Sequence, residues 1–389
     1  MKKKIFAFLL FLIMILSFSS QKVFAESAMD GIVKEQLQQV NTQKIEQFWD
    51  KLMKQYGGFF PENQKSLFDL VMPGNDFKFQ SFFIGLIKYI FYEILYNSKL
   101  IGSIILLTVF STVLQNIQTT FEQSTVSKVA FYVSYLVMMI IAINSFTVAI
   151  NSAKDSIQEM ISFMIALIPL VLALVASSGG IVSASMFHPF IIFLIHVIGT
   201  VIYKMIFPLI FFSAVLSIVS KISEKYQVSQ LAKLLRNISI GALGIFSTIF
   251  LGVISVQGAT AAVADGVTLR TAKYITGNFV PVVGKMFADA TDTVVGASLL
   301  VKNAVGMAGV LILLLIVIFP SIKILTLAFI YNFSSAIMQP LGDNPMIDTL
   351  NMIGKNLMFV FAALATVCLM FFLALTIIIS AGNITVMLR

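Results

Sequence analysis

Charged residues are scarce in this chain, because Asp, Glu, Lys and Arg together make up 11% of its 389 residues. Soluble globular domains carry about 25% charged residues, so this chain lacks the polar side chains that would cover a water-facing surface. Hydrophobic residues make up 58% of the sequence and recur in long runs. The composition excludes an ordinary soluble domain and predicts an all-α, polytopic helical membrane protein.

Cysteine and histidine are also nearly absent. Cys368 is the single cysteine, so neither an intramolecular disulfide nor a cysteine metal site can form. His188 and His196 are the two histidines, and the sequence contains neither the zinc-protease pattern His-Glu-x-x-His nor a Walker-type phosphate loop. We therefore expect no catalytic residues, no metal and no cofactor, and we predict that the chain is not an enzyme.

The N-terminus has the pattern of a secretion signal. Three lysines precede an apolar run from Ile5 to Leu16, and Val23-Phe24-Ala25 suits cleavage after residue 25. Removal of the four lysines in 1–25 leaves 22 basic and 18 acidic residues, a net charge of +4. This weak charge gives no argument for a nucleic-acid partner. The mature chain is expected to begin outside the cytoplasm.

Residues 26–99 are predicted to form a short extracytoplasmic segment of amphipathic helices. Within it, residues 79–96 place several aromatic and aliphatic side chains on one helical face, with few charges. This pattern favours a helix on the membrane surface. The alternative is a helix buried within the extracytoplasmic segment.

Seven apolar runs are candidate membrane spans, since a bilayer core requires about 20 helical residues. Two of them, 188–220 and 304–331, are too long for one straight crossing and contain Lys204 and Lys323. Each is predicted to be a kinked helix or a hairpin, and each lysine either faces a hydrated interior or reaches the interface near a bend. The seven runs are 100–118, 129–150, 160–177, 188–220, 238–256, 304–331 and 357–380.

The orientation follows from the exported N-terminus. If 26–99 lie outside, the spans 100–118, 129–150 and 160–177 enter, return and enter again. A hairpin at 188–220 then places residues 221–237 inside, with four cations against one acid. This arrangement satisfies the positive-inside preference, and we therefore favour the hairpin.

An offset of 112 residues aligns landmarks in two parts of the chain. Ile168-Pro169 matches Val280-Pro281, and Phe207-Pro208 matches Phe319-Pro320. This pattern predicts a tandem repeat of broken or hairpin transmembrane helices. Pro169, Pro208, Pro281 and Pro320 are the predicted helix breaks. The predicted organisation is a signal peptide (1–25), an extracytoplasmic segment (26–99), a transmembrane hairpin (100–150), a first repeat (151–258) and a threonine-rich segment with a second repeat (259–389).

Residues 257–303 are unusual because small, hydroxyl and singly charged residues interrupt the apolar pattern throughout. Such a stretch is predicted to be a re-entrant or amphipathic element that lines a pathway or contacts a subunit. The alternative is an ordinary loop at the membrane surface. The candidate pathway or partner-contact residues are Asp265, Thr268, Arg270, Thr271, Lys273, Asp289 and Asp292.

Four strings carry a resemblance to a known family: QFWDKLMKQYGGFFPE (47–62), FEQSTVSKVA (121–130), QLAKLLRNISIGALGIF (230–246) and FLGVISVQGATAAVADGVTLRTAKYITGNFVPVVGKMFADATDTV (250–294). With these strings the chain resembles the stage III sporulation protein AE family of endospore-forming bacteria, nearly from end to end. The resemblance implies a multi-pass protein of the mother-cell membrane around the forespore. It also implies partners, namely other stage III sporulation A operon proteins and stage II sporulation protein Q.

The function that the resemblance implies is a membrane subunit of a secretion-like channel complex between mother cell and forespore. Such a complex keeps the forespore intact and supports late gene expression. The family has no agreed catalytic residues to carry over. Two alternatives remain: a scaffold of that complex that conducts nothing, or a stand-alone secondary transporter. The surrounding lipid bilayer is an expected contact, and a homo-oligomer is a further possibility.

Overall fold

The computed structural model describes residues 42–59, 79–120, 125–220, 228–279, 283–341 and 345–387. All elements in these ranges are helical, and six helical runs are long and apolar enough to cross a membrane. The predicted all-α, multi-pass membrane architecture is therefore confirmed. Residues 1–25 and 221–227 lie outside the described residues, so the signal peptide and its cleavage stay predictions.

The helices fall into two short elements and a set of long ones. The short elements are α3 (Gln43–Tyr56), which ends in a 3₁₀ turn (Gly57–Phe59), and α5 (Phe79–Tyr96). The longer elements are α6 (Ser98–Thr120), α7 (Thr125–Ser177), α8 (Ile181–Val201), a π-helical turn (Ile202–Ile206), α9 (Phe207–Val219), α10 (Ser229–Phe279), α11 (Val283–Met338), a 3₁₀ turn (Gln339–Leu341) and α12 (Pro345–Met387).

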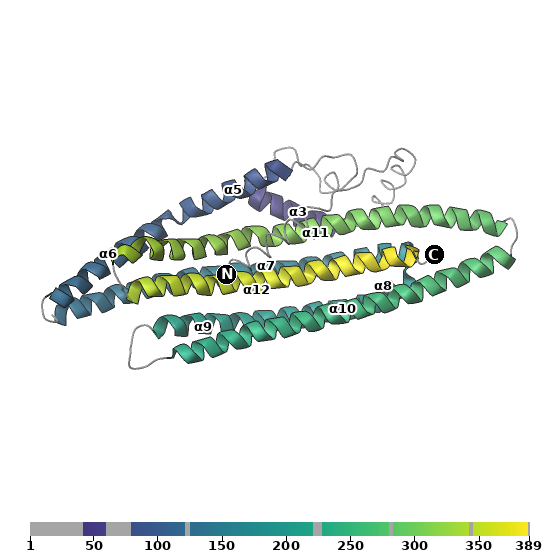
Figure 1. Ribbon diagram of the computed structural model, residues 1–389. Helices are drawn as coiled ribbons and strands as arrows, with labels where there is room; N and C mark the ends of the chain where they lie inside the picture. Colours follow the sequence, from purple (N-terminus) through teal and green to yellow (C-terminus); the bar gives the residue numbers. More distant parts are fainter. Residues whose placement is uncertain are drawn as a thin grey trace.

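The long helices lie side by side and alternate in direction (Figure 1). The C-terminal ends of α6, α9 and α11 lie at one end, on the left of Figure 1, which we call the near end. The connections α7–α8 and α10–α11 point the other way, toward the far end. At the ~1.5 Å rise per residue of an α-helix, the 53 residues of α7 extend about 80 Å. This length is more than twice the ~30 Å hydrocarbon core of a bilayer.

Interhelical hydrogen bonds set the relative heights of the helices. The hydroxyls of Tyr135 on α7 and Thr349 on α12 lie 2.9 Å apart. Ser213 on α9 donates to the backbone carbonyl of Ala232 on α10 at 2.7 Å. Because most of the surrounding side chains are apolar, these few polar contacts fix which turns face one another.

The prediction of two separate spans at 129–150 and 160–177 is wrong. A single helix, α7, runs through both, and residues 151–159 form helical turns instead of a connection. The charged residues in this stretch do not end the helix because Lys, Asp and Glu are all compatible with helical backbone, and no glycine or proline lies between 150 and 168.

The hairpin predicted for 188–220 is also wrong. α8, the π-helical turn and α9 form one unbroken helical run, and Lys204 lies within the π-helical turn. Pro208 lacks an N–H and would leave an α-helical hydrogen bond unmade. The preceding π turn accommodates this, because the N–H of Phe207 already bonds to the carbonyl of Ile202 in the wider pattern.

The four prolines predicted to break helices have different positions in the structure. α7 continues through Pro169, and α11 continues through Pro320, so neither residue ends a helix and 304–331 is no hairpin. Proline is tolerated inside such helices where neighbouring helices and local adjustments compensate for the lost hydrogen bond. Pro208 lies in the first turn of α9, where it follows a change of helix type without a turn of the chain. Pro281 lies outside the described residues.

The predicted duplication stays a prediction. With the 112-residue offset, the α7–α8 turn at 178–180 corresponds to 290–292, which lie inside α11. The predicted boundaries at 150 and 258 fall inside α7 and α10, so continuous helices cross them. The later parts keep a common order, because α8–α9 followed by α10 parallels α11 followed by α12.

Candidate functional site

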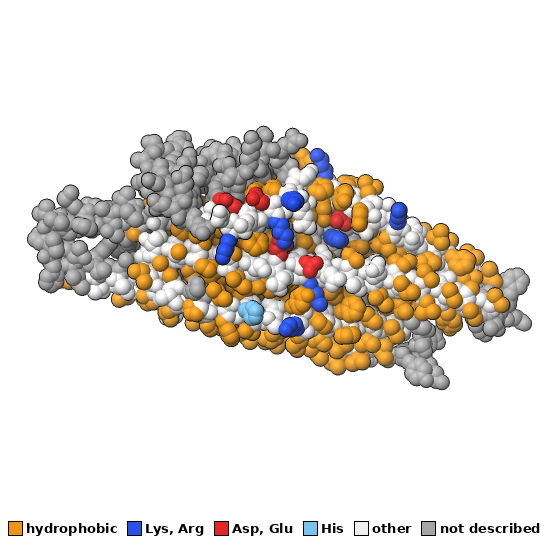
Figure 2. All heavy atoms as spheres, turned by 180° about the vertical axis from the view of Figure 1, so that it is seen from behind, with side chains coloured by type: hydrophobic (Ala, Val, Ile, Leu, Met, Phe, Trp, Pro, Cys, Tyr) orange, Lys and Arg blue, Asp and Glu red, His pale blue; other side chains and the backbone are white. Residues whose placement is uncertain are grey.

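Polar side chains are exposed near the middle of α7. Asn151, Asp155 and Gln158 are exposed at spacings of four and three residues, so they share one helical face. Lys154 and Glu159 flank this face and are partly exposed. Figure 2 shows charged side chains near the middle of the molecule, with apolar surface toward both ends.

The neighbouring helical run adds a cation at the same height. The Lys154 ammonium lies 4.7 Å from the centre of the Tyr203 ring, a cation–π contact between α7 and the π-helical turn. Lys204 follows directly and its side chain is exposed. There is no hairpin bend at Lys204 or at the partly exposed Lys323 of α11, so an explanation based on such a bend is wrong for both.

The amphipathic helix α3 packs beside this surface. Ile45, Trp49 and Leu52 are buried at spacings of four and three residues, which gives α3 one apolar face. The Phe48 ring meets Phe163 of α7 at 5.2 Å, and Lys51 forms a 2.9 Å ion pair with Glu159. The opposite face of α3 is exposed and polar, and consists of Gln43, Lys44, Glu46, Gln47, Asp50, Lys51, Lys54 and Gln55.

An aromatic cluster holds the end of α3 against α5 and α11. The rings of Tyr56 and Phe319 stack 3.9 Å apart, and Tyr89 of α5 meets the same Phe319 ring edge-on at 4.9 Å. Burial raises the pKa of Tyr56 to about 12, with the charges of Glu159 and Glu93 adding to the shift. Gly85 of α5 allows this approach, because the carbonyl of Phe59 lies where a Cβ atom would be.

We call this surface the mid-bundle polar face. It comprises Asn151, Lys154, Asp155, Gln158, Glu159, Lys204 and the exposed side of α3. Its mixture of acids, bases and amides contacts water or a polar partner far more favourably than lipid, since a single charge at the bilayer centre costs about 2.5–3.5 kcal/mol on insertion scales.

Apolar surface lies at the same height elsewhere on the bundle. From the Ser213–Ala232 contact, a count at ~1.5 Å per residue places residues 241 and 242 of α10 level with Lys204 and Tyr203. Arg236 and Asp265 bracket 28 uncharged residues of α10, and Ile245 and Ile249 there are 61% and 52% exposed. One face is therefore polar at a height where another face has the composition of a membrane span.

The described residues of the segment 257–303 are helical, and its predicted role stays a prediction. It consists of the end of α10 and the beginning of α11, around residues 280–282, which lie outside the described part of the chain. Thr268, Arg270 and Thr271 are exposed on α10. The side chains of Lys273, Asp289 and Asp292 lie outside the described residues, and a pathway role for this group stays a prediction.

Asp265 is buried and joins two elements. Its carboxylate accepts hydrogen bonds from the backbone N–H groups of Val182 at 2.8 Å and Ser183 at 3.0 Å. These are unpaired donors of the first turn of α8, where the helix dipole also favours a negative charge. Gly179, with φ of 99°, makes the tight turn that brings α8 to this position. Asp265 thus fixes α10 to the α7–α8 turn.

Sequence reasoning missed two polar features. The predicted spans leave residues 151–159 as a connection, although their polar side chains recur at helical spacing, which is typical of a polar helical face. Lys302 is fully buried in α11, and its ammonium donates to the carbonyl of Ile379 on α12 at 3.0 Å. A single lysine in an apolar run gives no signal of its partner, because that partner is a backbone group.

The family model described as stage III sporulation protein AE matches residues 63–382. The chain belongs to the stage III sporulation protein AE family. It is 58% identical over 351 residues to the stage III sporulation protein AE of Bacillus subtilis (strain 168), covering 90% of this chain and 88% of that protein. No solved structure matches.

Family membership supports a role in sporulation for this multi-pass membrane protein. Among the described residues, no three or more His, Cys, Asp and Glu side chains are grouped as metal ligands would be. The mid-bundle polar face is an open surface, on which charged and amide side chains can contact water or a polar partner.

Proposed function

We propose that the chain is a membrane subunit of a channel or secretion-like complex between mother cell and forespore, and that the mid-bundle polar face borders its hydrated route. The chain acts without catalysis of its own. The observation that carries the proposal is the exposed polar row Asn151, Asp155 and Gln158 at the height of the apolar surface of α10. A bilayer around α10 requires water or another polar surface opposite α7.

The proposed orientation places the N-terminal segment outside the cytoplasm. With six crossings, α6 enters, α7 returns and α8–α9 enters again, so that residues 221–227 lie inside together with Lys233 and Arg236. The fusion of two predicted spans into α7 removes one crossing, and the lost hairpin removes another. Because two crossings are lost, residues 221–227 stay on the same side of the membrane as predicted. The positive-inside preference is therefore satisfied with α7 and α8–α9 each crossing once.

The proposed location is the mother-cell membrane around the forespore, and the proposed partners are other stage III sporulation A operon proteins and stage II sporulation protein Q. α3 supports an exported partner surface, because its exposed side carries charges of both signs. A wet route along one face also requires a second wall, which further copies of this chain or a partner subunit would supply.

Charge reversal at Asp155 and Lys204 tests the proposal. We expect Asp155→Lys and Lys204→Glu each to reduce spore formation at least tenfold, because each changes the electrostatic potential along the route, whereas the protein still accumulates in the membrane and captures its operon partners. The matched control is Thr248→Ser on the apolar surface of α10, which should leave sporulation unchanged. The measurements are heat-resistant spore counts and co-purification from sporulating cells.

Two outcomes would contradict the channel. Normal spore counts in both reversal variants would show that the mid-bundle polar face does not border a hydrated route. Loss of partner capture, with the chain still folded in the membrane, would favour the non-conducting scaffold. A stand-alone transporter would instead move a solute into liposomes that contain this chain alone.

A further inference from the structure

The outward side of α5 is an apolar stripe that no described element covers. Ile84, Ile87, Phe91 and Leu95 recur at spacings of three, four and four residues and are 46%, 51%, 62% and 70% exposed. The opposite side of the helix is packed, because Tyr89 and Glu93 are buried and joined by a 2.9 Å hydrogen bond. Exposed apolar surface of this kind marks a contact site.

The stripe continues into a membrane span. The N–H of Asn97 bonds to the carbonyl of Glu93, and the N–H of Ile101 bonds to the carbonyl of Asn97, so α5 leads into α6 with helical hydrogen bonds. Leu106, Phe110 and Val113 extend the row at spacings of four and three residues and are 67%, 51% and 49% exposed. Since α6 is a candidate span, its outward residues face lipid, and the row on α5 continues this face.

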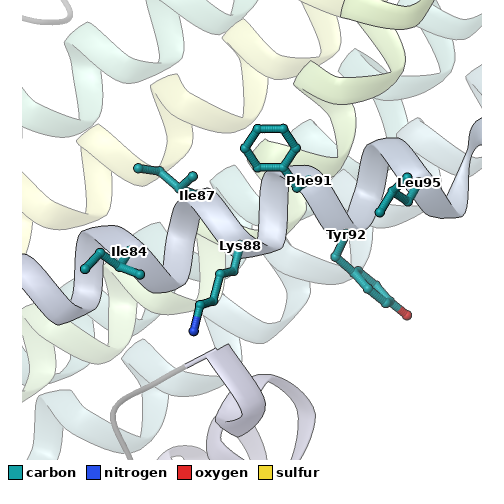
Figure 3. A pocket seen from close by; sticks show the side chains of 6 residues that line it. All are labelled: Ile84, Ile87, Lys88, Phe91, Tyr92 and Leu95. Carbon is teal, nitrogen blue, oxygen red and sulfur yellow. The ribbon is translucent and has the colours of Figure 1, made fainter.

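One cation borders the stripe. A shallow groove of about 400 Å³ is lined by the apolar stripe with Lys88 and Tyr92. Figure 3 shows that the Lys88 side chain extends away from Ile87 and Phe91. No acidic side chain forms an ion pair with Lys88 among the described residues. An aliphatic groove with an ammonium at its edge matches a phospholipid, whose acyl chain is apolar and whose phosphate is anionic.

We propose that α5 binds a phospholipid of the outer leaflet, with the acyl chain along Ile84, Ile87, Phe91 and Leu95 and the phosphate at Lys88. Together α5 and α6 extend about 60 Å at ~1.5 Å per residue, too long for one perpendicular crossing, so α5 lies where acyl chains meet headgroups. The leaflet assignment rests on the orientation proposed above. At the height of the Tyr56–Tyr89 contact, the bundle then separates lipid on the α5 side from water on the α3 side.

Tryptophan fluorescence tests this site because Trp49 is the single tryptophan. The full chain with Trp49→Phe and Phe91→Trp is reconstituted in vesicles that contain lipids brominated on their acyl chains. We expect Trp at 91 to be quenched at least twofold, as strongly as Trp at 110 in a Phe110→Trp chain on α6. Phe146→Trp, at a buried core position, is the control that should remain unquenched.

The contribution of Lys88 is tested with brominated phosphatidylglycerol against brominated phosphatidylcholine. Phe91→Trp should be quenched more by phosphatidylglycerol, because in phosphatidylcholine the choline cation of the same headgroup already compensates the phosphate. Lys88→Glu should abolish the difference, whereas Lys54→Glu on α3 should preserve it. Equal quenching by both lipids before the Lys88 change would overturn the phosphate contact. If the Trp49→Phe chain does not fold, a bimane label on Phe91→Cys in a Cys368→Ser background reports the same quenching.

Other outcomes separate this site from the proposed function. Quenching of residue 91 by aqueous iodide instead of brominated lipid would place α5 in water, and resistance to both would show a protein contact; either result overturns the lipid site. An Ile245→Trp reporter on α10 addresses the channel independently. Quenching by brominated lipid at 91 but not at 245 would sustain the lipid site and contradict the membrane height on which the channel depends.

Discussion

Lysine in place of Ile245 is expected to remove most of the chain from the membrane, whereas lysine in place of Gln158 is expected to be tolerated. Ile245 is 61% exposed within 28 uncharged residues of α10. A charge at such a position costs about 2.5–3.5 kcal/mol on insertion scales. A difference of this size corresponds to roughly a 100-fold shift in the insertion equilibrium, at ~1.4 kcal/mol per tenfold.

Gln158 is the matched control because it is exposed at nearly the same height, on the mid-bundle polar face. The measurement is the amount of each variant in the membrane fraction after an alkaline wash. Equal losses for both variants would mean that lipid surrounds α7 at this height. Equal tolerance would mean that α10 stands in water or against protein.

Loss of the Asp265 carboxylate in Asp265→Ala is expected to destabilise the far end of the bundle. The N–H groups of the partly buried Val182 and the buried Ser183 would lose their acceptors. Each buried N–H left unsatisfied costs about 1–3 kcal/mol. The thermal unfolding midpoint in detergent should therefore fall clearly, with Asp265→Asn intermediate because one carbonyl oxygen remains.

Thr268→Ala is the control for the change at Asp265. Thr268 is exposed three residues further along α10, and its hydroxyl bonds only to its own helix, at the carbonyl of Ala264. Exposed substitutions of this kind usually change stability by less than about 0.5 kcal/mol. An Asp265→Ala chain as stable as the Thr268→Ala chain would show that the capping contact is not formed in solution.

Composition and apolar runs were enough to predict the class of the fold, because few charges and long apolar helices leave no other solution. The connectivity was predicted less well. Lys204 and Pro208 predict a break in 188–220, yet a π-helical turn accommodates both residues. Whether an apolar run turns back depends on what its neighbours pack against it, and periodicity does not report that.

The candidate site was predicted least well. The sequence predicts Asp265 as a pathway or partner-contact residue, but its partners are backbone N–H groups of the same chain, 82 and 83 residues away. The polar row Asn151, Asp155 and Gln158 on α7 is not predicted from the sequence, because the predicted spans leave 151–159 as a connection. Its interpretation depends on the height of α10 on another side of the bundle, which follows from a contact between Ser213 and Ala232 that the sequence does not display.

Thiol accessibility tests the hydrated mid-bundle polar face most directly. Asp155→Cys and Ile245→Cys, each in a Cys368→Ser background, are expressed in non-sporulating cells, where the exported side of the chain faces the medium. Protoplasts of these cells are exposed to a membrane-impermeant maleimide added outside. Gln47→Cys serves as the exported reference and Lys233→Cys as the cytoplasmic one. A polar route open to the outside predicts labelling at 155 close to that at 47, with 245 and 233 protected. Protection of 155 together with 245, while 47 is labelled, would contradict it.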